Sequence, residues 1–196
     1  MSYESFHKNR NEIYRYIPRS EAKGELAMQT YTPAGMGPRF QHDFKEIKQY
    51  SRFAVITEES NFKYNGKQLG SGQFCIADSA FFHMFSIPLI RGEENKVLNR
   101  PGVVVISRTV AENFFSGEDP IGKLIQFDNK MLFEVTGVFE DVPRNTHLQF
   151  SYIASFISLP AMMEQLYQYK NDKILEDMGS WNYSTYLNIP HGVTPD

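Results

Sequence analysis

Histidines are the first candidates for chemistry, because imidazole is a common zinc ligand and a frequent general base. The sequence has five: His7, His42, His83, His147 and His191. No two of them follow the His-x3-His or His-Glu-x2-His spacing, with which one helix face presents two ligands to a zinc ion. We therefore expect no metal site. We interpret His42 as exposed on a helix, His83 as pointing outward from a short helix, and His147 as a turn residue.

Nucleophiles are the second candidates, and none has the surroundings that activate it. The Gly-x-Ser-x-Gly elbow is absent, so Ser71 and Ser116 are not expected to be catalytic. Residues 66–70 lack the spacing of a phosphate-binding loop and fit the tip of a hairpin. Cys75 is the only cysteine and lies in an apolar stretch, where a thiol usually serves as a small hydrophobe. The sequence thus indicates no catalytic, cofactor-binding or metal-ligating residue, and we do not expect an enzyme.

Composition narrows the class of protein further. The 196 residues include 20 Lys and Arg against 23 Asp and Glu, a net charge of −3 without a basic block, which excludes a typical nucleic-acid-binding protein. A hydrophobic fraction of 41% allows one generous domain or two small subdomains. No apolar run reaches the roughly 18–20 residues of a membrane span, and residues 2–15 are polar. Alone, these features predict a cytoplasmic protein, unless the targeting information lies outside this chain.

The hydrophobic pattern predicts short elements separated by turns. A helix is expected over residues 35–48, because Met36, Phe40 and Phe44 recur at four-residue steps. Residues 62–64 and 73–77 fit the two arms of a hairpin around Asn65-Gly66 or a slightly longer connection. Further strands are expected at residues 53–56, 103–106, 124–127, 131–139, 150–156 and 183–189.

Two short helices should pack against these strands. Asp78 is a plausible N-cap for a helix rich in phenylalanine, and Ser107 for one that ends at Phe115. Residues 103–106 are β-branched without alternation, which is typical of a strand buried on both faces. We therefore place Val104 and Phe82 in the core. The mixed order of helices and strands predicts an α+β fold with helices layered on a sheet.

Several stretches, taken in order, resemble one family. They are Ser-Phe-His-Lys-Asn (5–9) with Ile-Tyr-Arg (13–15), Thr-Pro-Ala (32–34) with Gly-Pro (37–38), Ala-Phe-Phe-His-Met-Phe (80–85) with Pro88, Leu89 and Gly92, Val-Val-Val-Ile-Ser (103–107) with Ala111, Phe114 and Phe115, Asp-Pro-Ile-Gly-Lys (119–123), and Val-Thr-Gly-Val (135–138) with Asp-Val-Pro (141–143), Asn145, His147, Leu148 and Phe150. Each motif alone is weak, but the ordered set resembles the MacB-like periplasmic core domain of FtsX-type ABC-transporter permeases, especially the form abundant in Bacteroidetes.

The resemblance implies a porter-like part at residues 1–49 and 100–196 and a small inserted α/β subdomain at residues 50–99. It implies the periplasmic domain of an inner-membrane permease that has four membrane helices and works as a homodimer with a cytoplasmic ABC ATPase. The domain would transmit conformational change and contact substrate or periplasmic partners, without a cofactor of its own. Relatives would continue past residue 196 into a further helix and strand.

The resemblance leaves the transported substrate open, and also whether a periplasmic adaptor and an outer-membrane channel take part. Two other classes of protein compete with it. An extracytoplasmic ligand-sensing domain of a membrane receptor would need a closed pocket with convergent polar groups. A stand-alone hydrolase would need a nucleophile paired with a base, for which the sequence gives no support.

Overall fold

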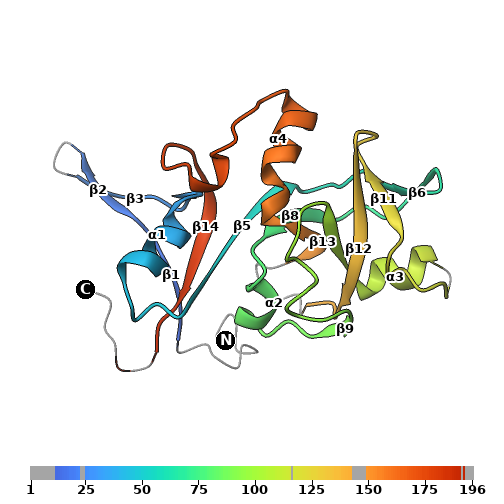
Figure 1. Cartoon of the computed structure of the whole chain (residues 1–196), viewed down its shortest axis with the longest axis horizontal. Helices are drawn as coiled ribbons and strands as arrows, with labels where there is room; N and C mark the ends of the chain where they lie inside the picture. Colours follow the sequence, from blue (N-terminus) through green and yellow to red (C-terminus); the bar gives the residue numbers. More distant parts are fainter. Residues whose placement is uncertain (1–11, 23–24, 116, 143–148, 191, 193–196) are drawn as a thin grey trace.

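The computed structural model describes residues 12–22, 25–115, 117–142, 149–190 and 192. Within them one mixed sheet of twelve strands carries the fold, with a separate two-stranded hairpin (Figure 1). The strand order along the sheet is β1 (Ile13–Arg15), β14 (Trp181–Asn188), β5 (Gln49–Thr57), β8 (Gln73–Ala77), β13 (Phe150–Ser155), β10 (Val103–Ser107), β12 (Met131–Phe139), β11 (Leu124–Phe127), β6 (Phe62–Tyr64) and β7 (Lys67–Gln68). β4 (Thr32–Pro33) pairs with β14, and β9 (Leu89–Arg91) pairs with β12.

Short helices cover this sheet. They are α1 (Met36–Asp43), α2 (Phe81–Met84), α3 (Arg108–Phe115), α4 (Leu159–Tyr167) and two 3-10 turns, η1 (Phe156–Ser158) and η2 (Ile174–Glu176). α3 and α4 pack on one large core cluster, whereas the phenylalanines of α2 belong to a second one. A third, small cluster of Ile47, Leu187 and Ile189 is packed by Phe40 of α1. The expected α+β fold with helices on a sheet is confirmed.

β10 lies in the middle of the sheet, as its sequence predicts. It pairs parallel with β12 and antiparallel with β13, and all five of its residues are buried. β-branched residues fit such a doubly covered strand. Val104 in β10 and Phe82 in α2 are both fully buried, and the Ser107 hydroxyl accepts a hydrogen bond from the Val110 amide at 3.3 Å. The predicted core positions and the predicted cap of α3 are confirmed.

α1 is shorter than the hydrophobic spacing predicts. The helix ends at Asp43, and the backbone of Phe44 is extended, with its side chain 50% exposed. The chain has to leave the helix here, because the Lys48 amide already donates to Asn188 O, alongside the start of β5. Ile47 is buried, but it belongs to the loop between α1 and β5 and not to the helix.

The predicted hairpin between residues 62–64 and 73–77 is wrong. Asn65 and Gly66 both have positive φ, 46° and 76°, and this two-residue turn pairs β6 with the adjacent β7. β6 also pairs with β11, whereas β8 pairs parallel with β13 and antiparallel with β5. A two-residue turn pairs the strands directly on either side of it, here β6 and β7. Residues 73–77 therefore pair with strands that are more distant in the sequence.

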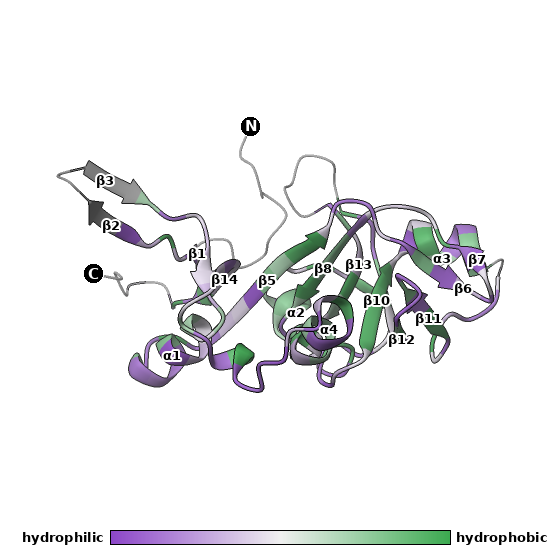
Figure 2. Ribbon diagram, turned by 90° about the horizontal axis from the view of Figure 1, so that it is seen from above, coloured by the Kyte–Doolittle hydropathy of each residue, from purple (hydrophilic) through white to green (hydrophobic). Residues whose placement is uncertain are grey.

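The segment 50–99 that we expect to be an inserted subdomain supplies β5 and β8 to the interior of the sheet. The division of the chain into two parts stays a prediction. The hairpin of β2 (Arg19–Ala22) and β3 (Glu25–Met28) extends away from the sheet at the end of the molecule opposite β6 (Figures 1 and 2). Across the described ranges, none of the helices combines the length and the apolar character that crossing a bilayer requires.

Candidate functional site

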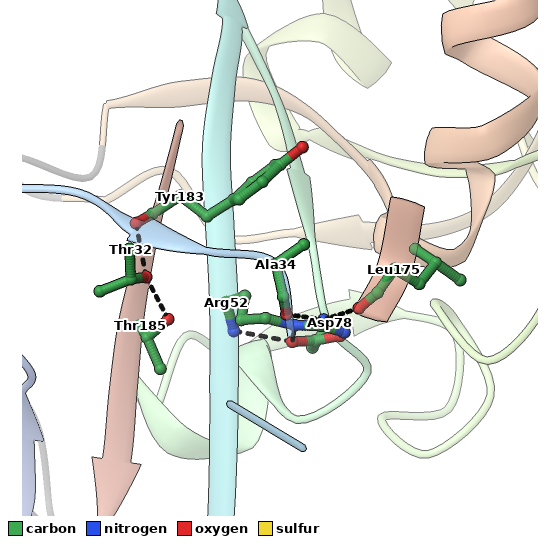
Figure 3. A network of polar contacts seen from close by, with 7 residues as sticks. All are labelled: Thr32, Ala34, Arg52, Asp78, Leu175, Tyr183 and Thr185. Atoms are coloured by element: carbon green, nitrogen blue, oxygen red, sulfur yellow. Dashed lines mark hydrogen bonds and ion pairs between the residues drawn. The ribbon is translucent and has the colours of Figure 1, made fainter. Parts of the chain in front are cut away.

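A buried ion pair forms between β5 and the residue that follows β8 (Figure 3). β5 contributes Tyr50 to the packing of the small core cluster, and Phe53 and Ala54 to the two large ones. Arg52 of β5 donates from Nε to Asp78 Oδ2 and from Nη2 to Asp78 Oδ1, both at 2.8 Å. The Arg52 amide donates to the same carboxylate at 2.8 Å, and the Asp78 amide donates back to Arg52 O at 3.0 Å. Arg52 is only 5% exposed. This forked geometry fixes the direction of both side chains.

The remaining guanidinium nitrogen of Arg52 reaches two other segments. Nη1 donates to Ala34 O, just before α1, and to Leu175 O in η2 at 3.0 Å (Figure 3). The guanidinium carbon also lies 4.0 Å from the centre of the Phe156 ring in η1. One side chain therefore connects β5, the end of β8, the entry to α1 and the chain after α4. We call Ala34, Arg52, Asp78 and Leu175 the Arg52 joint.

A second set of contacts fastens β4 beside the joint. The Thr32 hydroxyl donates to Tyr183 O at 2.8 Å and lies 2.6 Å from the Thr185 hydroxyl, and both threonines are fully buried. The Tyr183 ring meets Phe156 edge-on, with 5.2 Å between ring centres. β14 is thereby tied both to β4 and to the aromatic ring under Arg52.

The backbones also approach closely at the joint. A Cβ on Gly35 would lie 2.4 Å from Glu176 O, and the Gly35 amide donates to Asp177 O at 2.9 Å. Only glycine fits between α1 and η2 at this distance. A close backbone contact therefore adjoins the joint, in addition to its ion pair.

The tyrosines beside the joint stay neutral. Burial raises the pKa of the Tyr50 hydroxyl, and the negative charge of Asp78 raises it further against the opposing effect of Arg52. Burial likewise raises the pKa of Tyr183, with Asp177 adding to the shift. At neutral pH neither tyrosine therefore adds a negative charge beside the joint.

The residues that the sequence singled out for chemistry do not assemble into a site. His42 is exposed and bonded to Asp43 at 2.8 Å, and the exposed side chain of His83 lies 3.8 Å from Glu94. Cys75 is fully buried in β8, and desolvation raises its thiol pKa well above the usual value. No group of three potential metal ligands occurs in the described part of the chain. His7, His147 and His191 lie outside the described residues, as does Ser116.

Sequence reasoning missed the joint. It assigned Asp78 to the N-cap of α2, but α2 begins after Ala80 without a side-chain cap, and the Asp78 carboxylate binds Arg52 instead. A signal was present: a single Arg stands at the start of an apolar strand, and a single Asp follows the apolar residues 74–77. Charges next to buried strands need partners, since an unpaired buried charge is costly.

A surface groove adjoins the joint, where β5 and β14 separate. It has a volume of about 710 Å³ and is lined by the end of β5, by β14 and by α4. The groove is partly open to solvent, whereas a ligand-sensing domain would need a closed pocket.

The fold and the Arg52 joint together describe a mixed α+β structural domain, in which buried polar groups connect separate segments of the chain. The chain belongs to the family of MacB-like periplasmic core domains, whose model matches residues 6–196. It is thus the periplasmic domain of a MacB-like permease of the ABC-transporter type, as the resemblance implied. No curated protein matches the sequence.

Solved structures show the same fold. A domain of a permease protein from Porphyromonas gingivalis aligns with a TM-score of 0.76 and 20% identity, covering 96% of this chain and 77% of that one. The periplasmic region of MacB from Actinobacillus actinomycetemcomitans aligns at 0.64 and 16% identity, covering 96% and 81%. The extracellular domain of the noncanonic ABC-type transporter YknZ from Gram-positive bacteria aligns at 0.53 and 16% identity, covering 83% and 82%.

Proposed function

We propose that this domain is a non-catalytic part of an ABC permease, and that it transmits conformational change from the membrane to substrate or periplasmic partners. The observation that carries the proposal is the Arg52 joint. It ties four segments that are distant in sequence through one buried guanidinium group. A rigid connection of this kind lets a displacement of one segment move the others.

β5 is the strand along which such a displacement would travel. Its residues 49–53 pair with β14, and its residues 53–57 pair with β8. The small core cluster under α1 and the large clusters under α2, α3 and α4 are therefore linked by one continuous strand. Close-packed elements move as bodies and transmit strain between them.

The partners in this proposal are those of the family. The ABC ATPase supplies the energy from the cytoplasm, and the permease works as a homodimer. A periplasmic adaptor and an outer-membrane channel would receive the substrate where the transporter uses them. The β2–β3 hairpin, which extends from the sheet, is a suitable element for such a contact (Figure 2).

Transmission can be tested in the full-length permease, reconstituted with its ATPase. We compare Arg52→Met with Arg39→Met, since Arg39 forms an exposed pair with Asp43 at 2.9 Å. Proteins are first checked for equal assembly. Loss of transport with ATP hydrolysis retained, in Arg52→Met alone, supports the proposal. Equal transport by both variants, at equal amounts of folded protein, contradicts it.

A further inference from the structure

Among the described residues, one edge of β5 is unpaired along its second half. β14 pairs with β5 from Gln49 to Phe53, and then pairs with β4 instead. In the ranges that the structure covers, no strand pairs with residues 54–57 on the side that β14 has left. Figure 1 shows the two strands side by side at their lower ends and separating upward, with α4 beside the upper part of β5. Unpaired backbone groups of such an edge can accept another strand.

The groove follows this edge. Val55 and Ile56 of β5 form one wall, and Leu159, Met163 and Tyr167 of α4 contribute to the lining. Val55 is 42% exposed and Tyr167 is 62% exposed, so the apolar side chains are accessible from solvent. The volume of about 710 Å³ lies in the usual range of ligand sites, roughly 300–1,000 Å³.

The two ends of the groove differ in charge. At one end, Arg15 of β1 donates from Nη2 to Thr30 O at 2.8 Å and to Ser184 Oγ at 3.2 Å, while its buried Nε has no hydrogen-bond partner. Arg15 forms no ion pair in the described part of the chain. At the other end, Glu58 follows β5 and accepts a hydrogen bond from Gln73 Nε2. An occupant with a carboxylate near Arg15 complements this arrangement.

We propose that the groove binds an extended peptide segment of a partner protein, which adds a strand to residues 54–57 of β5. Alternate side chains of the peptide pack on Val55 and on α4, and an acidic group meets Arg15. Backbone pairing supplies affinity in this mode of recognition, and pockets for alternate side chains supply specificity. The inference deepens the proposed function, because it names one surface and one chemistry for contact with a partner.

Binding is measured by fluorescence anisotropy with the 196-residue chain. The probe is a labelled heptapeptide of alternating Val and Thr that ends in Asp. Two further peptides carry N-methyl groups on every second amide, one in each register, so that only one of them loses the donors that face β5. We expect one methylated register to weaken binding about tenfold and the other to leave it nearly unchanged. A peptide ending in amidated Asn should bind several-fold more weakly.

Variants locate the site. Tyr167→Ala and Val55→Asp should each weaken binding about tenfold or more, while Tyr169→Ala, an exposed tyrosine that does not line the groove, should not. Thermal unfolding confirms that the variants are folded. The proposal is overturned if binding does not saturate, or if the two methylated registers weaken it equally. Laurate, a fatty acid, serves as a competitor. If laurate displaces the probe fully and methylation has no effect in either register, the groove is an acyl-chain site instead. Peptide binding needs no ATPase, so it can fail while transmission through the Arg52 joint holds.

Discussion

Arg52 makes more interactions than any other residue of the joint, and its burial determines how much they contribute to stability. A buried ion pair adds little to stability compared with apolar residues of equal volume, because both charges have lost water. Removing one partner is different, since the other charge and the two backbone carbonyls are left without their bonds. The pair is therefore better suited to fixing geometry than to raising stability.

Arg52→Met should lower the free energy of unfolding by about 3–5 kcal/mol, because Asp78 is left buried and unpaired. The double variant Arg52→Met, Asp78→Leu should recover a large part of the lost free energy of unfolding. Such a recovery would show that the single variant is destabilised by the unpaired charge of Asp78. Urea unfolding followed by circular dichroism measures both. Arg39→Met, at the exposed pair, should change the free energy by at most about 1 kcal/mol. Equal losses at both arginines would refute the assignment.

Cys75 gives a second measurement at the residue scale. Burial raises its thiol pKa, so the folded chain holds the neutral form. Its contribution to stability is complete below the thiol pKa of the unfolded chain, about 8.5, and falls as the pH rises above that value. We expect iodoacetamide at pH 8.5 to label Cys75 only slowly in buffer and rapidly in denaturant. Rapid labelling of the native chain would place the thiol at the surface.

Among the elements, α1 and η2 depend on their close approach. Gly35→Ala should cost about 1–3 kcal/mol, because its Cβ would press on the Glu176 carbonyl and the backbone would have to shift. Gly179→Ala is the matched control, since its Cβ would meet only the Asp177 side chain at 3.4 Å. Thermal melts of the two variants measure the difference. A Gly35→Ala variant as stable as the control would mean that the two backbones separate at no cost.

The elements also show what the sequence can predict and what it cannot. β10 was predictable because its β-branched run is buried whatever its neighbours are, and α3 because Ser107 acts within one turn. The partner of β8 was not, since pairing with β13 joins residues more than seventy positions apart, and no local pattern encodes that choice. The Arg52 joint could not be predicted for the same reason, since Ala34, Arg52, Asp78 and Leu175 come from four separate segments. The sequence showed only that Arg52 and Asp78 each stand next to an apolar strand.

For the whole molecule, the continuity of the sheet makes a prediction about unfolding. β5 pairs with β14 and β8 pairs with β13, so residues 50–99 cannot leave without breaking the sheet on both sides. A domain bound together in this way should unfold in one transition. An independent subdomain at 50–99 predicts two transitions instead.

The sequence offers a convenient pair of probes for this test. Trp181 is the only tryptophan and reports on β14, near one end of the sheet, while hydrogen exchange of the β8 amides reports on the segment 50–99. We expect the fluorescence midpoint in urea to coincide with the concentration at which β8 loses protection. If the β8 amides exchange at a lower urea concentration, while the Trp181 fluorescence is still native, residues 50–99 open independently. β5 would then act as a flexible hinge. In that case the Arg52 joint could not transmit a displacement between the two parts of the domain.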